Sequence, residues 1–193
     1  RLVQDDNVVV KYPQIYYRGH IADIGWLEYV SDSLTAGQPG SGVALQALNI
    51  GFDNSEEDYK LSGSAYVEDL GWQDYKRIDS NTTFGTTGQD RAIKAIKLNL
   101  EDMPGYSLEY RVYITGRGWQ AWTSENEIAG NTINNIEAVQ FKMIYDNSKI
   151  EKIVLDKTDI VMAVDENNKI NAVVKPSDTT MDKTLTWKSS NPA

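Results

Sequence analysis

The stretch Gly63-Ser-Ala-Tyr-Val-Glu-Asp-Leu-Gly-Trp72 decides the fold, because the chain contains three versions of it. It aligns without gaps on Tyr17-Arg-Gly-His-Ile-Ala-Asp-Ile-Gly-Trp26 and on Tyr110-Arg-Val-Tyr-Ile-Thr-Gly-Arg-Gly-Trp119. The Gly-Trp pairs recur about every 46 residues, a period typical of repeat architectures. A second aromatic residue follows each Gly-Trp pair three positions later, as Tyr29, Tyr75 and Trp122.

Each repeat continues with a glycine-containing turn and an alternating strand. The turns are Gly37-Gln-Pro-Gly40, Gly85-Thr-Thr-Gly88 and Gly130-Asn-Thr-Ile133. The strands that follow are Gln46-Ala-Leu-Asn-Ile-Gly-Phe52, Lys94-Ala-Ile-Lys-Leu-Asn-Leu100 and Glu137-Ala-Val-Gln-Phe-Lys-Met143. Their period of two predicts half-buried strands. We expect Leu48, Ile96, Val139 and Phe141 to point to a common core.

Composition supports a β protein and excludes several classes of partner. Eleven Tyr and five Trp favour pleated, half-buried surfaces. The net charge of -9 is spread along the chain and should repel phosphate backbones and anionic lipid, so we expect neither nucleic acid nor membrane insertion. The chain has no Cys, which excludes disulfides, thiol catalysis and zinc-cysteine sites.

The order aromatic-x-x-His/Tyr-Val/Ile, Gly-Trp-Gln-x-Trp, Gly-Thr-Thr-Gly and Glu-Ala-Ile-x-Ile-x-Leu resembles the clostridial hydrophobic repeat with conserved tryptophan, the ChW repeat. The resemblance covers roughly residues 12 to 145, and the first repeat departs most from it, with Leu27 and Gln46 in place of Gln and Glu. We therefore predict a three-repeat domain over residues 1–147, with repeats at about 12–54, 55–102 and 103–147. The resemblance implies surface attachment or substrate adhesion and names no ligand.

The sequence changes character from Ile150 onward. Ile153-Val-Leu-Asp-Lys-Thr158, Ala172-Val-Val-Lys-Pro176 and Leu185-Thr-Trp-Lys-Ser-Ser-Asn-Pro192 resemble the first half of a bacterial Ig-like group 2 domain. We expect residues 148–193 to form an incomplete stalk domain, because a sandwich needs about seven strands. The chain starts at Arg1 and stops within a strand and turn pattern, so we expect the rest of a larger multidomain protein, secreted or on the cell surface.

The strand pattern predicts an all-β fold with pseudo-threefold repeats plus part of an Ig-like β-sandwich. Three long hairpins in a six-stranded barrel, capped by three short ones, would make a β-trefoil, which is our first expectation. A β-prism, with three sheets related by the same pseudo-threefold axis, would use similar strands. A linear array of repeats is the third possibility.

Catalysis has little support in the sequence. The one histidine, His20, has Tyr66 and Tyr113 as its counterparts, so the position requires a planar amphipathic ring and we expect a structural role. No nucleophile elbow, zinc-protease, phosphate-loop or dinucleotide motif occurs. Asp53-Asn54 and Asp146-Asn147 lack the dense oxygen ligands of a calcium loop. We predict no enzyme activity, no cofactor and no metal.

The paired aromatic residues are the candidate binding groups. We expect Trp26, Trp72 and Trp119 in the core, since an aromatic repeated in every unit is commonly buried. A spacing of three in a strand then puts the second aromatics on the opposite face, nearer solvent. An exposed ring beside amides and carboxylates is the usual chemistry of a sugar site. The candidates are Trp122 with Gln120, and Tyr75 with Gln73 and Asp74.

The sequence thus predicts a non-catalytic adhesion module that binds a glycan of the cell envelope, of a host or of a plant polymer. The alternative is a structural or protein-protein adhesion spacer with both aromatics of each pair buried and no small-molecule site.

Overall fold

The computed structural model describes residues 13–53, 59–163 and 166–188, and these residues form β-strands and no helix. The all-β prediction is confirmed. The first repeat supplies β1 (Gln14–Ile21), β2 (Gly25–Trp26), β3 (Val30–Ser31), β4 (Ala36–Gly37) and β5 (Leu45–Asp53). The second supplies β6 (Lys60–Val67), β7 (Gly71–Tyr75), β8 (Phe84–Gly85) and β9 (Ile93–Glu101). The third supplies β10 (Tyr106–Ile114), β11 (Gly118–Trp119), β12 (Thr123–Ser124), β13 (Ala129–Gly130) and β14 (Ile136–Tyr145).

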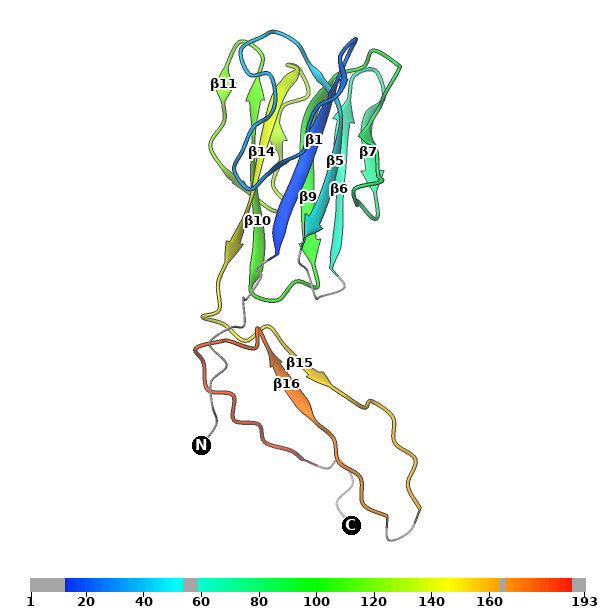
Figure 1. Cartoon of the computed structure of the whole chain (residues 1–193), viewed down its shortest axis with the longest axis vertical. Helices are drawn as coiled ribbons and strands as arrows, with labels where there is room; N and C mark the ends of the chain where they lie inside the picture. Colours follow the sequence, from blue (N-terminus) through cyan, green and yellow to red (C-terminus); the bar gives the residue numbers. More distant parts are fainter. Residues whose placement is uncertain (1–12, 54–58, 164–165, 189–193) are drawn as a thin grey trace. The chain divides into compact units, whose positions relative to one another are not determined.

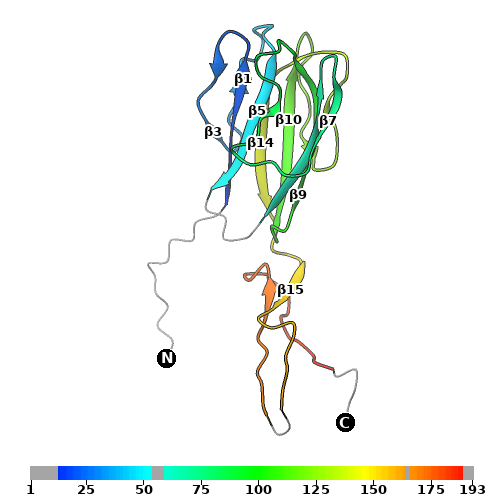
Figure 2. The same ribbon diagram turned by 90° about the vertical axis from the view of Figure 1, so that its right-hand side faces the viewer.

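The chain divides into two compact units. The first ends at Met103 and resumes over Ser107–Ile144, and the second holds Pro104–Tyr106 and the chain from Tyr145 onward. In the first unit each repeat folds its two long strands into an antiparallel hairpin, β1 with β5, β6 with β9 and β10 with β14. The long strands lie along one common axis, with neighbours in a pair pointing in opposite directions (Figures 1 and 2).

The Gly-Trp segments form the short strands β2, β7 and β11, which pair with the opening strand of their own repeat. The register is the same in all three sheets: His20 lies opposite Trp26, Tyr66 opposite Trp72 and Tyr113 opposite Trp119. The alignment of the three repeats therefore corresponds to the same strand pairing in space.

The glycine-turn strands join the sheet of a different repeat. β4 of the first repeat pairs with β14 of the third, β8 of the second with β5 of the first, and β13 of the third with β9 of the second. Glycine is required there: Gly37, Gly85 and Gly130 have φ angles of 115°, 115° and 99°, which other residues rarely adopt. A Cβ atom at these positions would lie 2.2 to 2.4 Å from a carbonyl oxygen of the neighbouring strand.

The closing strands carry the core. Leu48, Ile96, Val139 and Phe141, which the alternation assigns to the interior, are fully buried. The long hairpins belong to three separate sheets, and none of these sheets closes among the described residues. The six-stranded barrel of a β-trefoil is therefore not confirmed.

Two tyrosine hydroxyls tie the sheets together. The Tyr17 hydroxyl of β1 accepts a hydrogen bond from the Phe141 N–H of β14 at 3.1 Å and donates to the Leu34 carbonyl. The Tyr110 hydroxyl of β10 accepts from the Leu98 N–H of β9 at 3.0 Å and donates to a carbonyl as well. The Tyr17 bond links the first repeat to the third, as β4 does, and the Tyr110 bond links the third repeat to the second, as β13 does. Gly63 occupies the equivalent position of the second repeat, which has no such bond.

The second unit contains a two-stranded antiparallel sheet, β15 (Lys152–Leu155) with β16 (Ala172–Lys175). Val174 is buried, whereas Ile153 is 51% exposed and Trp187 is 57% exposed. The Ig-like sandwich predicted for this segment is not confirmed, because the described residues supply only these two paired strands. In the described part of the chain, none of the elements is a helix long and apolar enough to span a membrane.

Candidate functional site

The tryptophans of the Gly-Trp pairs lie at the surface, and the prediction that they are core residues is wrong. Trp72 is 40% exposed, and Trp26 and Trp119 are half-buried. On the opening strand β1, Ile15, Tyr17 and Ile21 point inward, so His20 and its cross-strand neighbour Trp26 share the outer face. The same alternation places the other two tryptophans outside.

Each tryptophan packs against the ring opposite it. The ring centroids of His20 and Trp26 are 5.2 Å apart in an edge-to-face contact. The Tyr66–Trp72 and Tyr113–Trp119 pairs repeat this contact, each at 5.5 Å. The planar ring expected at these three positions thus has a packing role on the outer face, in agreement with the structural role predicted for His20.

In the first and third repeats an arginine lies against both aromatics of the pair. The Arg18 guanidinium is 4.9 Å from the Trp26 ring centroid and 4.5 Å from that of Tyr29. Arg111 lies 4.9 Å from Trp119 and 4.7 Å from Trp122. Both rings of a pair therefore flank one cation on the outer face, so the opposite-face prediction is wrong in these repeats.

A break in the strand explains this correction. β2 and β11 each end at their tryptophan, and irregular chain follows. Alternation between faces holds only along continuous strand, so it does not carry from Trp119 to Trp122.

Hydrogen bonds within the protein also hold the two arginine side chains in place. Arg18 Nε donates to Asn49 Oδ1 at 3.0 Å, and Arg111 Nε donates to Gln140 Oε1 at 2.7 Å. The Lys142 ammonium lies 4.3 Å from the Trp122 ring centroid. The predicted platform Trp122 is thus half-buried between two cations.

The second repeat is built differently. β7 runs unbroken over Gly71–Tyr75, so here the two aromatics do lie on opposite faces, with Trp72 outside and Tyr75 turned inward. The Tyr75 ring packs 4.8 Å from Phe84, and its hydroxyl accepts from the Gly85 N–H at 3.0 Å. Ser64 stands where the other repeats have arginine.

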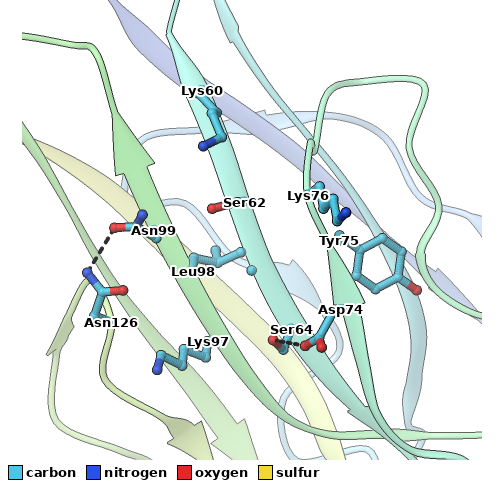
Figure 3. Close-up of a pocket in the computed structure, with 11 residues that line it drawn as sticks. Lys60, Ser62, Ser64, Asp74, Tyr75, Lys76, Lys97, Leu98, Asn99 and Asn126 are labelled. Carbon is cyan, nitrogen blue, oxygen red and sulfur yellow. Dashed lines mark hydrogen bonds between the residues drawn. The ribbon is translucent and has the colours of Figure 1, made fainter.

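The short Ser64 side chain leaves a groove on the outer face of β6, β7 and β9. The groove has a volume of about 460 Å³ and is open to solvent. Figure 3 shows the side chains that line it. The strand register places Ser62 beside Asn99 and Ser64 beside Lys97. The lining residues are Lys60, Ser62, Gly63, Ser64, Asp74, Tyr75, Lys76, Lys97, Leu98, Asn99 and Asn126.

Hydrogen bonds fix several polar groups along the groove. Ser64 Oγ donates to Asp74 Oδ1 at 2.6 Å, and Asn126 Nδ2 donates to Asn99 Oδ1 at 2.8 Å (Figure 3). Lys60 forms an ion pair of 2.9 Å with Glu101. The hydrogen bond within this pair raises the pKa of Lys60. The groove thus presents hydroxyl, amide, carboxylate and ammonium groups in positions set by neighbouring strands.

The structure brings together two of the five predicted site residues. Asp74 and Tyr75 both line the groove, although the Tyr75 ring is turned toward Phe84. The Gln73 amide donates to the carbonyl groups of Leu70 and Trp72, at 3.0 and 3.2 Å.

The other two candidates lie in the third repeat. The Gln120 Oε1 atom accepts from the Gly130 N–H at 2.7 Å, so it binds the backbone of β13, the strand that pairs with β9. Trp122 belongs to the Arg111 cluster.

The sequence interpretation missed the polar side chains of β6 and β9, namely Ser62, Ser64, Lys97 and Asn99. A signal for them exists, because the aligned repeats have Arg18, Ser64 and Arg111 at one position. The loss of arginine in the second repeat indicates an uncovered outer face.

A second hollow, of about 580 Å³, lies beside His20 and is lined by residues of the Gly88–Asp90 turn. The His20 Nδ1 atom is buried and has no hydrogen-bond partner. Throughout the described ranges, this hollow included, no group of three or more His, Asp or Glu side chains is arranged to hold a metal ion.

Comparison with known proteins matches part of the chain to one family. The family model described as ChW, Clostridial hydrophobic W, matches residues 20–54 and 66–102. These ranges begin at His20 and Tyr66, the rings that pack on the tryptophans, and run through the closing strands of the first two repeats. No curated protein and no solved structure matches the chain.

Proposed function

We propose that the chain is a non-catalytic adhesion module of a secreted or cell-surface bacterial protein, and that it binds a carbohydrate on the outer face of the β6, β7 and β9 sheet. The exposed Trp72 beside the polar groove is the observation that carries this proposal. The match of the first two repeats to the ChW family supports a repeat module of this kind.

Trp72 supplies a stacking surface next to the groove. It shares the outer face of β7 with Asp74, two residues away, which along a strand is a distance of about 7 Å. A sugar ring on Trp72 would therefore reach the groove with its hydroxyl groups. The apolar face of a pyranose packs on an indole, as other apolar surfaces do.

The groove supplies the hydroxyl-binding groups. Asp74 accepts hydrogen bonds, Ser62 and Ser64 both donate and accept, and the Asn99 and Asn126 amides do the same. The groove is shallow, so a single site would bind weakly. Strength would come from several copies of the module or from several repeating units of a polymer.

The proposal extends to the architecture. We infer that the third repeat, 103–147, is a further ChW repeat, because its register and its strand exchange match those of the first two. We further propose the β-prism alternative for this domain, and the cyclic exchange of strands among three sheets supports it. The segment from 148 onward would serve as part of an Ig-like stalk.

A structural spacer is the second candidate function, and the arginine clusters favour it. In the first and third repeats the aromatics already contact Arg18 and Arg111, so they serve packing within the protein. Under this hypothesis the second repeat would bind no ligand either.

A glycan array probed with the full chain on a multivalent carrier tests the proposal. The variants are Trp72→Ala and, as a matched control, Trp187→Ala, which removes an exposed tryptophan of the second unit. We expect Trp72→Ala to lose glycan retention while stability changes by less than about 1 kcal/mol, and the control to bind as the unsubstituted chain does. Retention unaffected by Trp72→Ala, or no glycan bound by any form, would support the spacer.

A further inference from the structure

The charge of the groove is opposite to that of the chain. The chain has a net charge of -9, yet the lining includes three lysines and a single carboxylate. The lysines are Lys60, Lys76 and Lys97, and the carboxylate is Asp74. Positive charge is thus concentrated where the proposed ligand would lie, on a chain whose net charge is negative.

Among the residues that the structure describes, two of the three lysines have no acidic partner. Lys60 pairs with Glu101 at 2.9 Å, whereas none of the ion pairs among the described residues includes Lys76 or Lys97. Asp74, the acidic residue of the lining, is hydrogen-bonded to Ser64. The ammonium groups of Lys76 and Lys97 are therefore available to an external anion.

The repeats differ in where the cation of the outer face lies and in whether aromatic rings cover it. In the first repeat Arg18 donates to Asn49, and in the third Arg111 donates to Gln140. In the second repeat the aligned pair is Ser64 and Lys97, so the cation stands on the closing strand and the neutral side chain on the opening strand. Arg18 and Arg111 are covered by aromatic rings, whereas Lys97 lines the open groove.

The positions of the lysines suit a ligand with repeated charge. Figure 3 shows Lys60, Lys76 and Lys97 around different sides of the groove, with Ser62 and Asn99 in the space between them. An anionic sugar unit could meet an ammonium group while its hydroxyls meet the amides and hydroxyls. A neutral sugar would leave the two unpaired cations without a partner.

We infer that the groove binds an acidic glycan, one whose sugar or polyol units carry carboxylate or phosphate groups. This inference rests on the proposed carbohydrate-binding function and names its ligand class. Both anions share the chemistry that lysine recognises, which is a negative oxygen reached by an ammonium donor.

The test uses the full chain on a multivalent carrier with three immobilised polymers. Polygalacturonate supplies carboxylates, poly(glycerol phosphate) supplies phosphates, and fully methyl-esterified polygalacturonan supplies the same sugar without charge. The variants are Lys76→Gln with Lys97→Gln together, and Lys169→Gln as a control on an exposed lysine of the second unit. Thermal melts check that each variant remains folded.

We expect the unsubstituted chain to bind at least one anionic polymer and to lose binding as salt is raised, because salt screens exposed charge pairs. The double lysine variant should bind roughly tenfold more weakly at low salt, and Lys169→Gln should bind normally. The polymer that is retained identifies carboxylate or phosphate as the group bound.

Two outcomes would overturn the inference and differ in what they leave standing. Equal binding of the esterified polymer, unaffected by the lysine substitutions but lost in Trp72→Ala, would refute the acidic ligand and keep the carbohydrate site. Failure of every polymer and every array glycan to bind would refute both.

Discussion

Replacing Tyr17 or Tyr110 by Phe removes a hydroxyl that joins the sheets of two repeats. Both side chains are fully buried, and each accepts a hydrogen bond from a backbone N–H of a neighbouring closing strand, Phe141 in one case and Leu98 in the other. Loss of the hydroxyl leaves that N–H without its partner. Each substitution should therefore lower the free energy of unfolding by about 1–3 kcal/mol.

The same burial predicts a loss of stability in alkali. Burial raises the pKa of Tyr17 and of Tyr110 to about 12. A raised pKa means that the stabilisation is complete below the unfolded value, about 10, and is lost as the pH rises through the folded value. At pH 11 the unfolded tyrosine is mostly ionised and the folded one mostly neutral, which costs about 1.4 kcal/mol per residue relative to pH 8.

Urea denaturation at pH 8 and pH 11 measures this effect. The double variant Tyr17→Phe with Tyr110→Phe should be less stable at pH 8, but it should lose about 2.8 kcal/mol less between the two pH values than the unsubstituted chain does. Tyr66→Phe, at a partly exposed tyrosine, is the control for removal of a tyrosine hydroxyl and should lower stability at pH 8 by less than either core substitution. A double variant as sensitive to alkali as the parent would refute the role assigned to these hydroxyls.

Arg111→Ala should lower stability by about 1–2 kcal/mol, because the guanidinium contacts two indoles and an amide. Thermal melts followed by tryptophan fluorescence measure the loss, and an unchanged melting temperature would mean that the cluster does not stabilise the fold. Trp119→Ala should cost less than the 3–5 kcal/mol typical of a core aromatic, since it is half-buried, and a larger loss in urea would contradict its surface position. Gly130→Ala should destabilise more than Gly116→Ala, because only the former places its Cβ 2.4 Å from a carbonyl oxygen; equal urea midpoints would argue against the close strand contact. Backbone amides after Ile150 should exchange with deuterium faster than those of the long strands, and equal protection would contradict an incomplete second unit.

The closing strands and their buried faces follow from the sequence because alternation is a local property. Leu48 and Phe141 are buried as their period of two predicts. The gapless alignment likewise predicts that His20 and Tyr66 occupy equivalent positions, and both pack on a tryptophan. These features depend on residues within one hairpin, where sequence pattern and geometry are directly connected.

The strand exchange and the faces of the tryptophans could not be predicted in this way. Ala36-Gly37 pairs with β14, about one hundred residues later, and nothing in its local pattern names that partner. The face of Trp122 depends on a break in the strand that a spacing of three does not reveal. The contrast between Arg111 and Ser64 is the one sequence signal that separates a covered outer face from an open one.

The exchange of glycine-turn strands sets the number of repeats that the fold needs. Each closing strand takes its last partner from another repeat, β14 from the first, β5 from the second and β9 from the third, so the cycle is satisfied by three units and by no smaller number. A chain with two repeats would leave unpaired edges that a second molecule could fill, which gives a swapped assembly. A chain with a single repeat would need two further copies of itself to complete the same cycle of strand pairs.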